Sequence, residues 1–253
     1  MLLLLAHIIG DFYVQTDFIS RKKKTNFGWV LLHCLFYWVV AMAVSLPVMS
    51  LETALFGTLS AAAHLAIDIL KYFVGLKAAK MPATGKTERN IFFADQILHL
   101  AAMASVAFLF EAQGNELWVN DGAAEVLSVL GISAKSLLNW AVALFVVHKP
   151  VNIAISLLLT PYRPESKNED LKPEGMKTEE AKPKDRSAGR FIGTLERLII
   201  LFLIYLNQYS AIGLVLTAKS IARYDKITKD PAFSEYYLLG TLLSTQIAVS
   251  FIL

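Results

Sequence analysis

Three pairs of histidine and aspartate, each spaced four residues apart, lie inside apolar stretches of this 253-residue sequence. The pairs are His7 with Asp11, His64 with Asp68, and Asp95 with His99. Because residues four apart share one face of an α-helix, each pair would present an imidazole beside a carboxylate. Nitrogen and oxygen ligands of this kind suit Zn²⁺, Mn²⁺ or Fe²⁺ better than the thiolate-selective Cu⁺. The sequence therefore predicts a divalent-metal site with these six residues as ligands.

Four further residues extend this prediction. His33 falls at a similar depth in the second apolar stretch and is added as a seventh ligand, although no carboxylate lies four residues away. Gln15 and Gln96 are expected to orient the ligands by hydrogen bonds from outside the coordination shell. Lys149 lies beside Pro150 inside another apolar stretch. It could pair with an aspartate or bind a phosphate; equally, it could snorkel to the interface or mark a break between two short helices.

The elements that must position these residues are predicted to be membrane-spanning helices. Hydrophobic residues make up 55% of the chain and charged residues 18%, whereas a soluble domain has about a quarter of its residues charged. Apolar blocks of about 20 residues recur, which is the helix length that crosses the hydrocarbon core. The fold class is therefore an all-α, polytopic transmembrane helix bundle of about seven spans. The expected spans are 2–20, 27–47, 52–76, 90–112, 136–160, 191–217 and 233–253.

Charged connections predict the orientation of the chain. The connections 21–26 and 77–89 are rich in lysine and arginine, whereas 113–135 is mostly acidic. Because basic loops stay in the cytoplasm, the N-terminus and the 113–135 loop are expected outside. The Pro-, Glu- and Lys-rich segment 161–189 is expected to be a disordered cytoplasmic linker between a membrane bundle, 1–160, and C-terminal membrane helices, 190–253. The polar run 207–210 could break the sixth span, which leaves the orientation of the last two elements open.

In this topology the first and third spans run inward and the fourth runs outward. All three imidazoles would then lie nearer the outside than their carboxylates, as a ring of histidines above a ring of aspartates. Each charge inside a bilayer costs at least about 2.5–3.5 kcal/mol on insertion scales, a penalty that convergence on a cation would offset. The alternatives are hydrogen bonds between helices and a path for protons or ions.

Four basic residues near the predicted membrane edge are expected to meet anionic lipid head groups, at about 1 kcal/mol per charge. They are Arg190, Arg197, Lys219 and Arg223. Interface anchoring is the alternative role. The single cysteine, Cys34, allows no disulfide framework. The sequence contains no P-loop, no G-x-S-x-G and no dinucleotide fingerprint, and nothing in it favours nucleic-acid binding.

The stretches "AHIIGDFYVQ", "HLAID" and "DQILH" resemble the N-terminal signature of an uncharacterised bacterial membrane-protein family, domain of unknown function 3307. The stretches "GRFIGTLERLIILFLIYLNQYSAIGLVLTAKSIARY" and "EYYLLGTLLS" resemble its second block. The resemblance covers about residues 4–112 and 189–247 and implies a multi-pass protein of the bacterial cytoplasmic membrane, with no established activity. The chain is more distantly similar to bacterial membrane-bound, metal-dependent hydrolases, which also place His-x-x-x-Asp pairs on transmembrane helices.

Three functions fit these features. The first is a metal-dependent hydrolase acting on a lipid or lipid-linked phosphate, with Asp68, Asp95 and Lys149 as catalytic residues and the bound metal activating water. The second is a transporter of protons or metal ions. The third is a non-catalytic membrane scaffold. Membrane lipid is the expected partner in each case, and the oligomeric state stays open.

Overall fold

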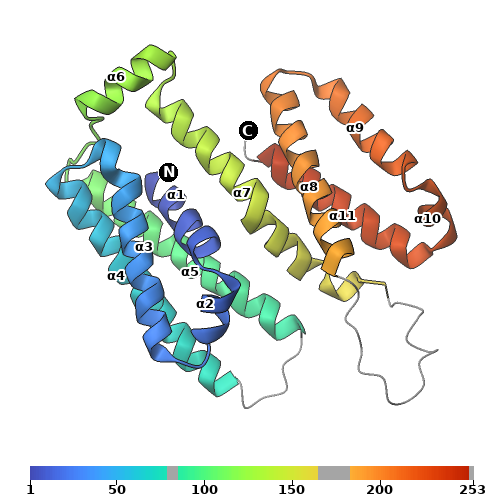
Figure 1. Ribbon diagram of the computed structural model, residues 1–253, viewed down its shortest axis with the longest axis horizontal. Coiled ribbons are helices and arrows are strands. Elements are labelled where there is room, and N and C mark those ends of the chain that lie inside the picture. Colours follow the sequence, from blue (N-terminus) through green and yellow to red (C-terminus); the bar gives the residue numbers. More distant parts are fainter. Residues whose placement is uncertain (79–84, 165–182, 251–253) are drawn as a thin grey trace. The chain divides into compact units, whose positions relative to one another are not determined.

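The computed structural model describes residues 1–78, 85–164 and 183–250, and all regular secondary structure in these ranges is helical (Figure 1). The predicted all-α fold is confirmed. The chain divides into two compact units, Met1–Val146 and Val147–Leu253. This boundary lies inside a helix, whereas the sequence analysis placed it at the linker 161–189. Residues 165–182 of that predicted linker lie outside the described residues.

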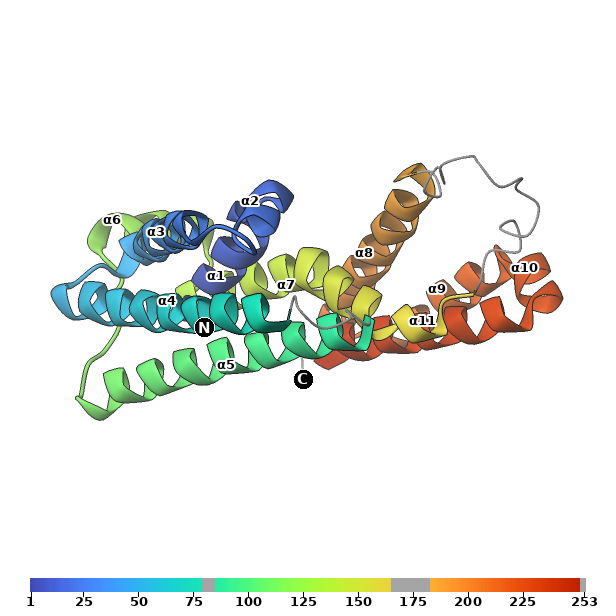
Figure 2. The ribbon, with the colours of Figure 1, turned by 90° about the horizontal axis from the view of Figure 1, so that it is seen from below.

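The N-terminal unit is built from two long helices connected as a hairpin, a third helix beside them, and a short apolar helix at the N-terminus (Figures 1 and 2). In chain order its elements are α1 (Leu2–Ile8), the π-helical η1 (Ile9–Val14), α2 (Asp17–Lys22), α3 (Phe27–Ser45), η2 (Leu46–Val48), α4 (Leu51–Ala78), α5 (Gly85–Ala112) and α6 (Asp121–Leu130). Helix α3 packs on α4, α4 packs on α5, and α1 contacts both α3 and α5. Short polar caps start these helices: the Asn26 side chain accepts a hydrogen bond from the Gly28 N–H at 2.8 Å, which begins α3.

Within the described part of the chain, four helices are long and apolar enough to cross a membrane. They are Phe27–Val48, Leu51–Leu76, Thr87–Ala112 and Ala134–Leu158, with 22, 26, 26 and 25 residues. These correspond to the predicted spans 27–47, 52–76, 90–112 and 136–160. Large apolar side chains such as Leu55 and Leu98 are exposed on them, as expected for surfaces that contact lipid. The helices therefore indicate a membrane protein.

The first predicted span, 2–20, is interrupted. Leu2–Val14 is a short apolar helix, well below the roughly 20 residues that a membrane crossing needs. It ends because Gln15 and Thr16 have extended backbone conformations. The Thr16 hydroxyl then accepts a hydrogen bond from the Ile19 N–H at 3.3 Å and starts α2 as a separate helix.

The second unit contains the end of α7 (Ala134–Leu158), η3 (Thr160–Tyr162), α8 (Pro183–Tyr205), α9 (Tyr209–Ile221), α10 (Tyr224–Lys229) and α11 (Pro231–Ser250). The predicted span 191–217 is broken between α8 and α9, where Asn207 has a φ of 57°. The break falls within the polar run 207–210, as expected, and Figures 1 and 2 show that α9 turns back from the end of α8. Ile200, Ile204 and Ala248 form the buried core of this unit.

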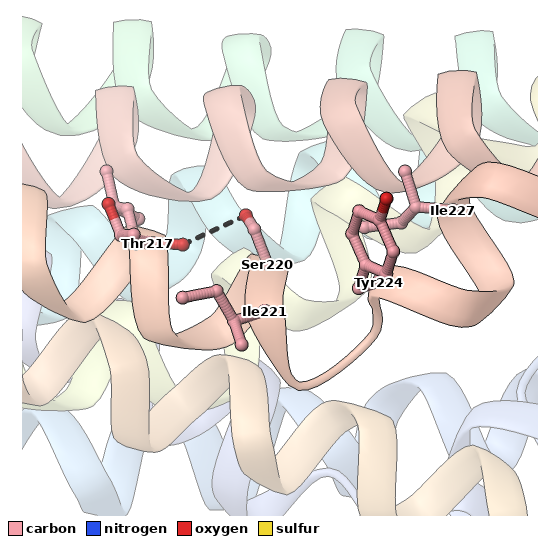
Figure 3. Close-up of a pocket in the computed structure, with 6 residues that line it drawn as sticks. Thr217, Ser220, Ile221, Tyr224 and Ile227 are labelled. Atoms are coloured by element: carbon pink, nitrogen blue, oxygen red, sulfur yellow. Dashed lines mark hydrogen bonds between the residues drawn. The ribbon is translucent and has the colours of Figure 1, made fainter.

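A shallow groove lies on the second unit where α9 leads into α10 (Figure 3). Its lining consists of Leu216, Thr217, Ser220, Ile221, Tyr224 and Ile227. The Ser220 hydroxyl is already used, because it donates to the Leu216 carbonyl at 2.9 Å. The groove therefore offers no charged side chain for catalysis or metal binding.

Candidate metal centre

The seven predicted ligands come together inside the N-terminal unit. They are His7 from α1, Asp11 from η1, His33 from α3, His64 and Asp68 from α4, and Asp95 and His99 from α5. We call them the His/Asp cluster. All seven are buried, with exposed fractions of 5% or less for six of them and 9% for the Asp11 side chain. Five helical elements thus deliver four imidazoles and three carboxylates to one place.

Two imidazoles lie between two carboxylates at the centre of the cluster. His33 Nε2 is 3.1 Å from Asp11 Oδ1 and 3.5 Å from Asp68 Oδ2. His64 Nε2 is 3.4 Å from Asp11 Oδ1 and 3.4 Å from His33 Nε2. His33, which has no carboxylate four residues away in sequence, therefore meets carboxylates from two other elements.

Each of the four imidazoles has one buried ring nitrogen without a hydrogen-bond partner among the described residues. His99 Nδ1 lies 2.8 Å from the Asp95 carbonyl oxygen, so this nitrogen donates and Nε2 carries the lone pair. His99 Nε2 is buried and has no hydrogen-bond partner among the described residues. His7 Nε2 lies 3.3 Å from Gln96 Oε1, and its buried Nδ1 is likewise without a hydrogen bond. A buried nitrogen lone pair left open in this way is suited to a metal ion.

Three overlapping groups of ligand atoms are compact enough to hold an ion, since the atoms in each group lie within 4.8 Å of one another. The groups are His7, Asp11 and His64; His33, His64 and Asp68; and Asp68, Asp95 and His99. Zinc bonds to nitrogen and oxygen are about 2.0–2.2 Å long, so ligand atoms around one ion lie up to about 4.4 Å apart. The buried His/Asp groups could therefore hold a metal ion after small side-chain shifts.

Two lysines that the sequence analysis did not assign to the site complete it. Lys23 Nζ is 2.9 Å from Asp68 Oδ2, and Lys71 Nζ is 2.6 Å from Asp95 Oδ2. Burial of Lys23 favours the neutral amine, but the carboxylates of Asp68 and Asp11 outweigh this and raise the pKa of Lys23 above its ordinary value. Lys71 could have been found, because it follows Asp68 by three residues on the same helix face. Lys23 stands in a basic block that was assigned to membrane topology alone.

Of the two glutamines expected to orient ligands, Gln96 contacts the cluster. Its Oε1 accepts from His7, and its Nε2 donates to Asp95 Oδ2 at 3.2 Å, so it connects α1 to α5. Gln15 follows η1, and its side-chain oxygen is buried without a hydrogen bond. The structure shows no contact between Gln15 and a ligand.

Close packing of α1 against α3 fixes the imidazoles. A Cβ atom on Gly10 would stand 2.7 Å from Tyr37 Cδ2, so only glycine lets the two helices approach this closely. The Tyr37 ring in turn stacks on His64, with 3.8 Å between ring centroids and 7° between ring planes. Gly10 and Asp11 both belong to the π-helical turn η1, a feature that occurs often at functional sites.

Lys149 belongs to the second unit and is half-buried in α7. The helix continues through Pro150, so Lys149 does not mark a break between two short helices. Its predicted catalytic role with Asp68 and Asp95 stays a prediction.

The four basic residues expected to meet lipid head groups differ in their surroundings. Arg197 is buried and donates to Val147 O at 2.9 Å, Asn152 Oδ1 at 2.7 Å and Ser244 Oγ at 3.2 Å. The Arg197 guanidinium, on α8, thus connects α7 and α11. These neutral acceptors replace the water that would otherwise solvate it. Lys219 also points inward, to Glu196 and Thr241. Arg190 is exposed and Arg223 is partly exposed, so these two remain available at the surface.

Comparison with known proteins relates the cluster to a family. Residues 1–124 match the family described as "Protein of unknown function (DUF3307)". This range is similar to the DUF3307 domain and covers just under half of the chain. The matched range contains the whole His/Asp cluster, together with Lys23 and Lys71, and it confirms the resemblance carried by the three His/Asp stretches. The second block of that resemblance, 189–247, lies outside the match. No curated protein and no solved structure matches the chain.

Proposed function

We propose that the N-terminal unit binds a divalent metal ion in the His/Asp cluster and uses it to hydrolyse a lipid or lipid-linked phosphate. The observation that carries the proposal is that the cluster contains more acidic side chains than there are lysines beside it. Asp11, Asp68 and Asp95 carry three negative charges, while Lys23 and Lys71 supply only two positive ones. A cation bound among the three carboxylates would offset their mutual repulsion and the cost of keeping them away from water.

A divalent ion bound in the cluster would offset the excess of acidic side chains. Once the ion is bound, the cluster and its two lysines carry one net positive charge, which favours hydroxide or an anionic substrate. The donor set of imidazoles and carboxylates suits Zn²⁺, Mn²⁺ or Fe²⁺. Such an ion lowers the pKa of bound water to near neutrality and polarises a phosphoryl oxygen. Attack on phosphorus would release the lipid alcohol and inorganic phosphate.

The surroundings of the cluster favour a phosphate carried by a lipid. The helices that hold it expose large apolar side chains such as Leu55 and Leu98, which favours a substrate that is itself carried in the lipid phase. Lys23 and Lys71 can stabilise negative charge on phosphoryl oxygens when a metal takes over Asp68 and Asp95. Lys71, whose side chain is 35% exposed, lies on the way to the surface. In this proposal the two lysines take the role that the sequence analysis gave to Lys149.

The test is phosphate release by the purified full-length protein from a panel of lipid phosphates in Zn²⁺, Mn²⁺ or Fe²⁺. Mutation of a residue that only orients a metal ligand typically lowers activity by about 10–100-fold. Because Asp68→Asn and Asp95→Asn change predicted ligands themselves, each should lower the rate of phosphate release by at least that factor. Asp17→Asn is the matched control, because Asp17 is exposed at the start of α2. Failure of the wild type to release phosphate from any lipid of the panel would contradict the proposal.

Transport of a metal ion or proton is the second candidate. It is favoured by the direct pairing of Lys23 with Asp68 and of Lys71 with Asp95. An incoming cation could displace each ammonium group from its carboxylate, and the ammonium group could displace the cation again on release. Metal uptake into liposomes that contain the protein, without phosphate release, would support transport over hydrolysis. If neither activity occurs and substitutions in the cluster change only stability, the scaffold role is supported.

A further inference from the structure

An apolar pocket of about 300 Å³ lies between the helices of the N-terminal unit. This volume falls at the lower end of the roughly 300–1,000 Å³ typical of small-molecule sites. Leu3 and Leu4 of α1, Phe56 and Gly57 of α4, and Met103 and Ala107 of α5 are among the residues that line it. We infer that this pocket binds the hydrocarbon chain of the substrate whose phosphate reaches the His/Asp cluster, an inference that rests on the proposed function.

The pocket continues the same helix faces that carry the imidazoles. Leu3 precedes His7 by four residues, and Met103 follows His99 by four residues. Residues four apart lie above one another, about 6 Å along the helix axis. Gly57 precedes His64 by seven residues, which is two turns on the same face of α4. The pocket is therefore one to two turns from the histidines on three separate helices.

The lining of the pocket favours a hydrocarbon chain over water or a polar ligand. Its two hydroxyl-bearing side chains are already satisfied: Ser45 donates to the Ala41 carbonyl at 2.8 Å, and the Thr53 hydroxyl lies 3.1 Å from that of Ser50. Neither hydroxyl is left without a partner. The one residue of the lining with a charged side chain, Glu111, is exposed to the surroundings. The rest of the cavity is apolar and does not hold water well, whereas a lipid chain is available on the apolar faces around it.

Polarity thus changes in order along α4. Phe56 and Gly57 line the pocket, His64 and Asp68 belong to the cluster, and Lys71 pairs with Asp95 beyond it. On α5, which runs beside α4, Met103 and His99 come in the matching order. An amphiphile with its phosphate at the cluster and its chain in the pocket matches this order. The substrate class is therefore a single-chain or long-chain phosphate ester, not a soluble phosphate.

The experiment uses dodecyl phosphate with a diazirine at the end of its chain, cross-linked by light to the metal-loaded full-length protein in lipid nanodiscs. Mass spectrometry of the peptides should place saturable labelling on the α5 residues that line the pocket. Unlabelled dodecyl phosphate should compete, and butyl phosphate should compete far less, because each buried methylene group is worth about a fourfold gain in affinity. Labelling spread evenly over lipid-facing residues, without competition, would overturn the inference.

Two substitutions sharpen the test. Ala107→Trp fills the pocket, and Ala101→Trp is its control, since Ala101 is exposed on the same helix but does not line the pocket. Ala107→Trp should lower the specific labelling more than about tenfold, the equivalent of losing two or more buried methylene groups, and Ala101→Trp should leave it unchanged. Metal content should be unchanged in both. If Ala107→Trp fails to fold, Ala104→Phe, which also fills the pocket, decides the question.

This result is separable from that of the proposed function. Specific labelling without phosphate release would keep the pocket and reject the hydrolase. Phosphate release with equal rates for butyl and dodecyl phosphate, and no specific labelling, would keep the hydrolase and reject the pocket.

Discussion

The ammonium groups of Lys23 and Lys71 lie directly against two carboxylates of the His/Asp cluster, those of Asp68 and Asp95. Both partners of the first pair are nearly inaccessible to solvent, with 11% of the Lys23 side chain and 2% of the Asp68 side chain exposed. A pair this buried is costly to break, because the remaining charge has no water to solvate it. Loss of Lys23 would therefore leave the Asp68 carboxylate buried without its cationic partner.

Replacing Lys23 by methionine tests this view. In chelator, the Lys23→Met protein should be destabilised by about 3–5 kcal/mol, the cost of leaving one partner of a buried pair alone. Added Mn²⁺ or Zn²⁺ should restore much of this loss, because the ion supplies the missing positive charge next to Asp68. Thermal unfolding of the protein in detergent, with and without metal, measures both effects.

Lys24→Met serves as the control, since Lys24 is exposed and forms no ion pair in the described structure. Equal destabilisation of the Lys23→Met protein in metal and in chelator would mean that no ion enters beside Asp68.

Which residues of the site could be predicted depended on whether helix geometry alone brings them together. The pairs such as His64 and Asp68 were accessible from spacing, because a helix places residues four apart on one face. His33 and Lys23 were not, since their contacts depend on which helices become neighbours and how far a side chain reaches. The sequence analysis used Lys23 only to predict membrane topology, whereas the structure places it against Asp68 of the cluster.

At the scale of elements, the approach of α1 to α3 decides whether the cluster closes. Gly10 lets the π-helical turn η1 lie directly against Tyr37, and Tyr37 stacks on His64. Asp11 belongs to the same turn. One contact between helices thus sets the positions of a carboxylate and an imidazole together.

Gly10→Ala should therefore weaken metal binding. The added Cβ would lie 2.7 Å from the Tyr37 ring, and overpacking of this kind typically costs about 1–3 kcal/mol. If that cost falls on the closed cluster, metal affinity drops by about 5–150-fold, which equilibrium dialysis with Zn²⁺ or Mn²⁺ would measure. Gly75→Ala is the control, because a Cβ there meets nothing within 4 Å. Unchanged affinity in Gly10→Ala would show that α1 does not hold the ligands in place.

Hydropathy predicted the long helices but not the interruptions that shape the shorter ones. The four spans between residues 27 and 158 are apolar on average despite their buried His and Asp residues, so window length and composition were sufficient. The break after Val14 depends on Thr16 acting as a helix cap, which an average over a window conceals. That break matters for the site, because it ends the helix one turn beyond Asp11.

At the scale of the whole molecule, the chain passes from one compact unit to the other inside α7, between Val146 and Val147. The division predicted at the linker 161–189 stays a prediction, since residues 165–182 lie outside the described part of the chain. The DUF3307 match ends at residue 124, before this helix begins. The proposed chemistry therefore belongs to the N-terminal unit by itself.

The distribution of lysine and arginine predicts how this unit lies in the membrane. In a Cys34→Ser background, Lys24→Cys should be protected from a membrane-impermeant maleimide in intact cells, and Gln113→Cys should react. Both positions are exposed in the structure and lie outside the four long apolar helices, so access depends on the membrane side alone. The reverse labelling pattern would place Lys24 outside and Gln113 in the cytoplasm.

Metal content is the most direct measure of the central claim that the His/Asp cluster is a metal centre. The full-length protein, purified from cells supplied with zinc, manganese and iron, would be analysed by inductively coupled plasma mass spectrometry and then stripped and titrated. The wild type should hold at least one divalent ion per chain, and Asp68→Asn should bind it at least about 10–100-fold more weakly, while Asp17→Asn binds normally. A wild-type protein that is purified without metal and takes up none on titration would contradict the account.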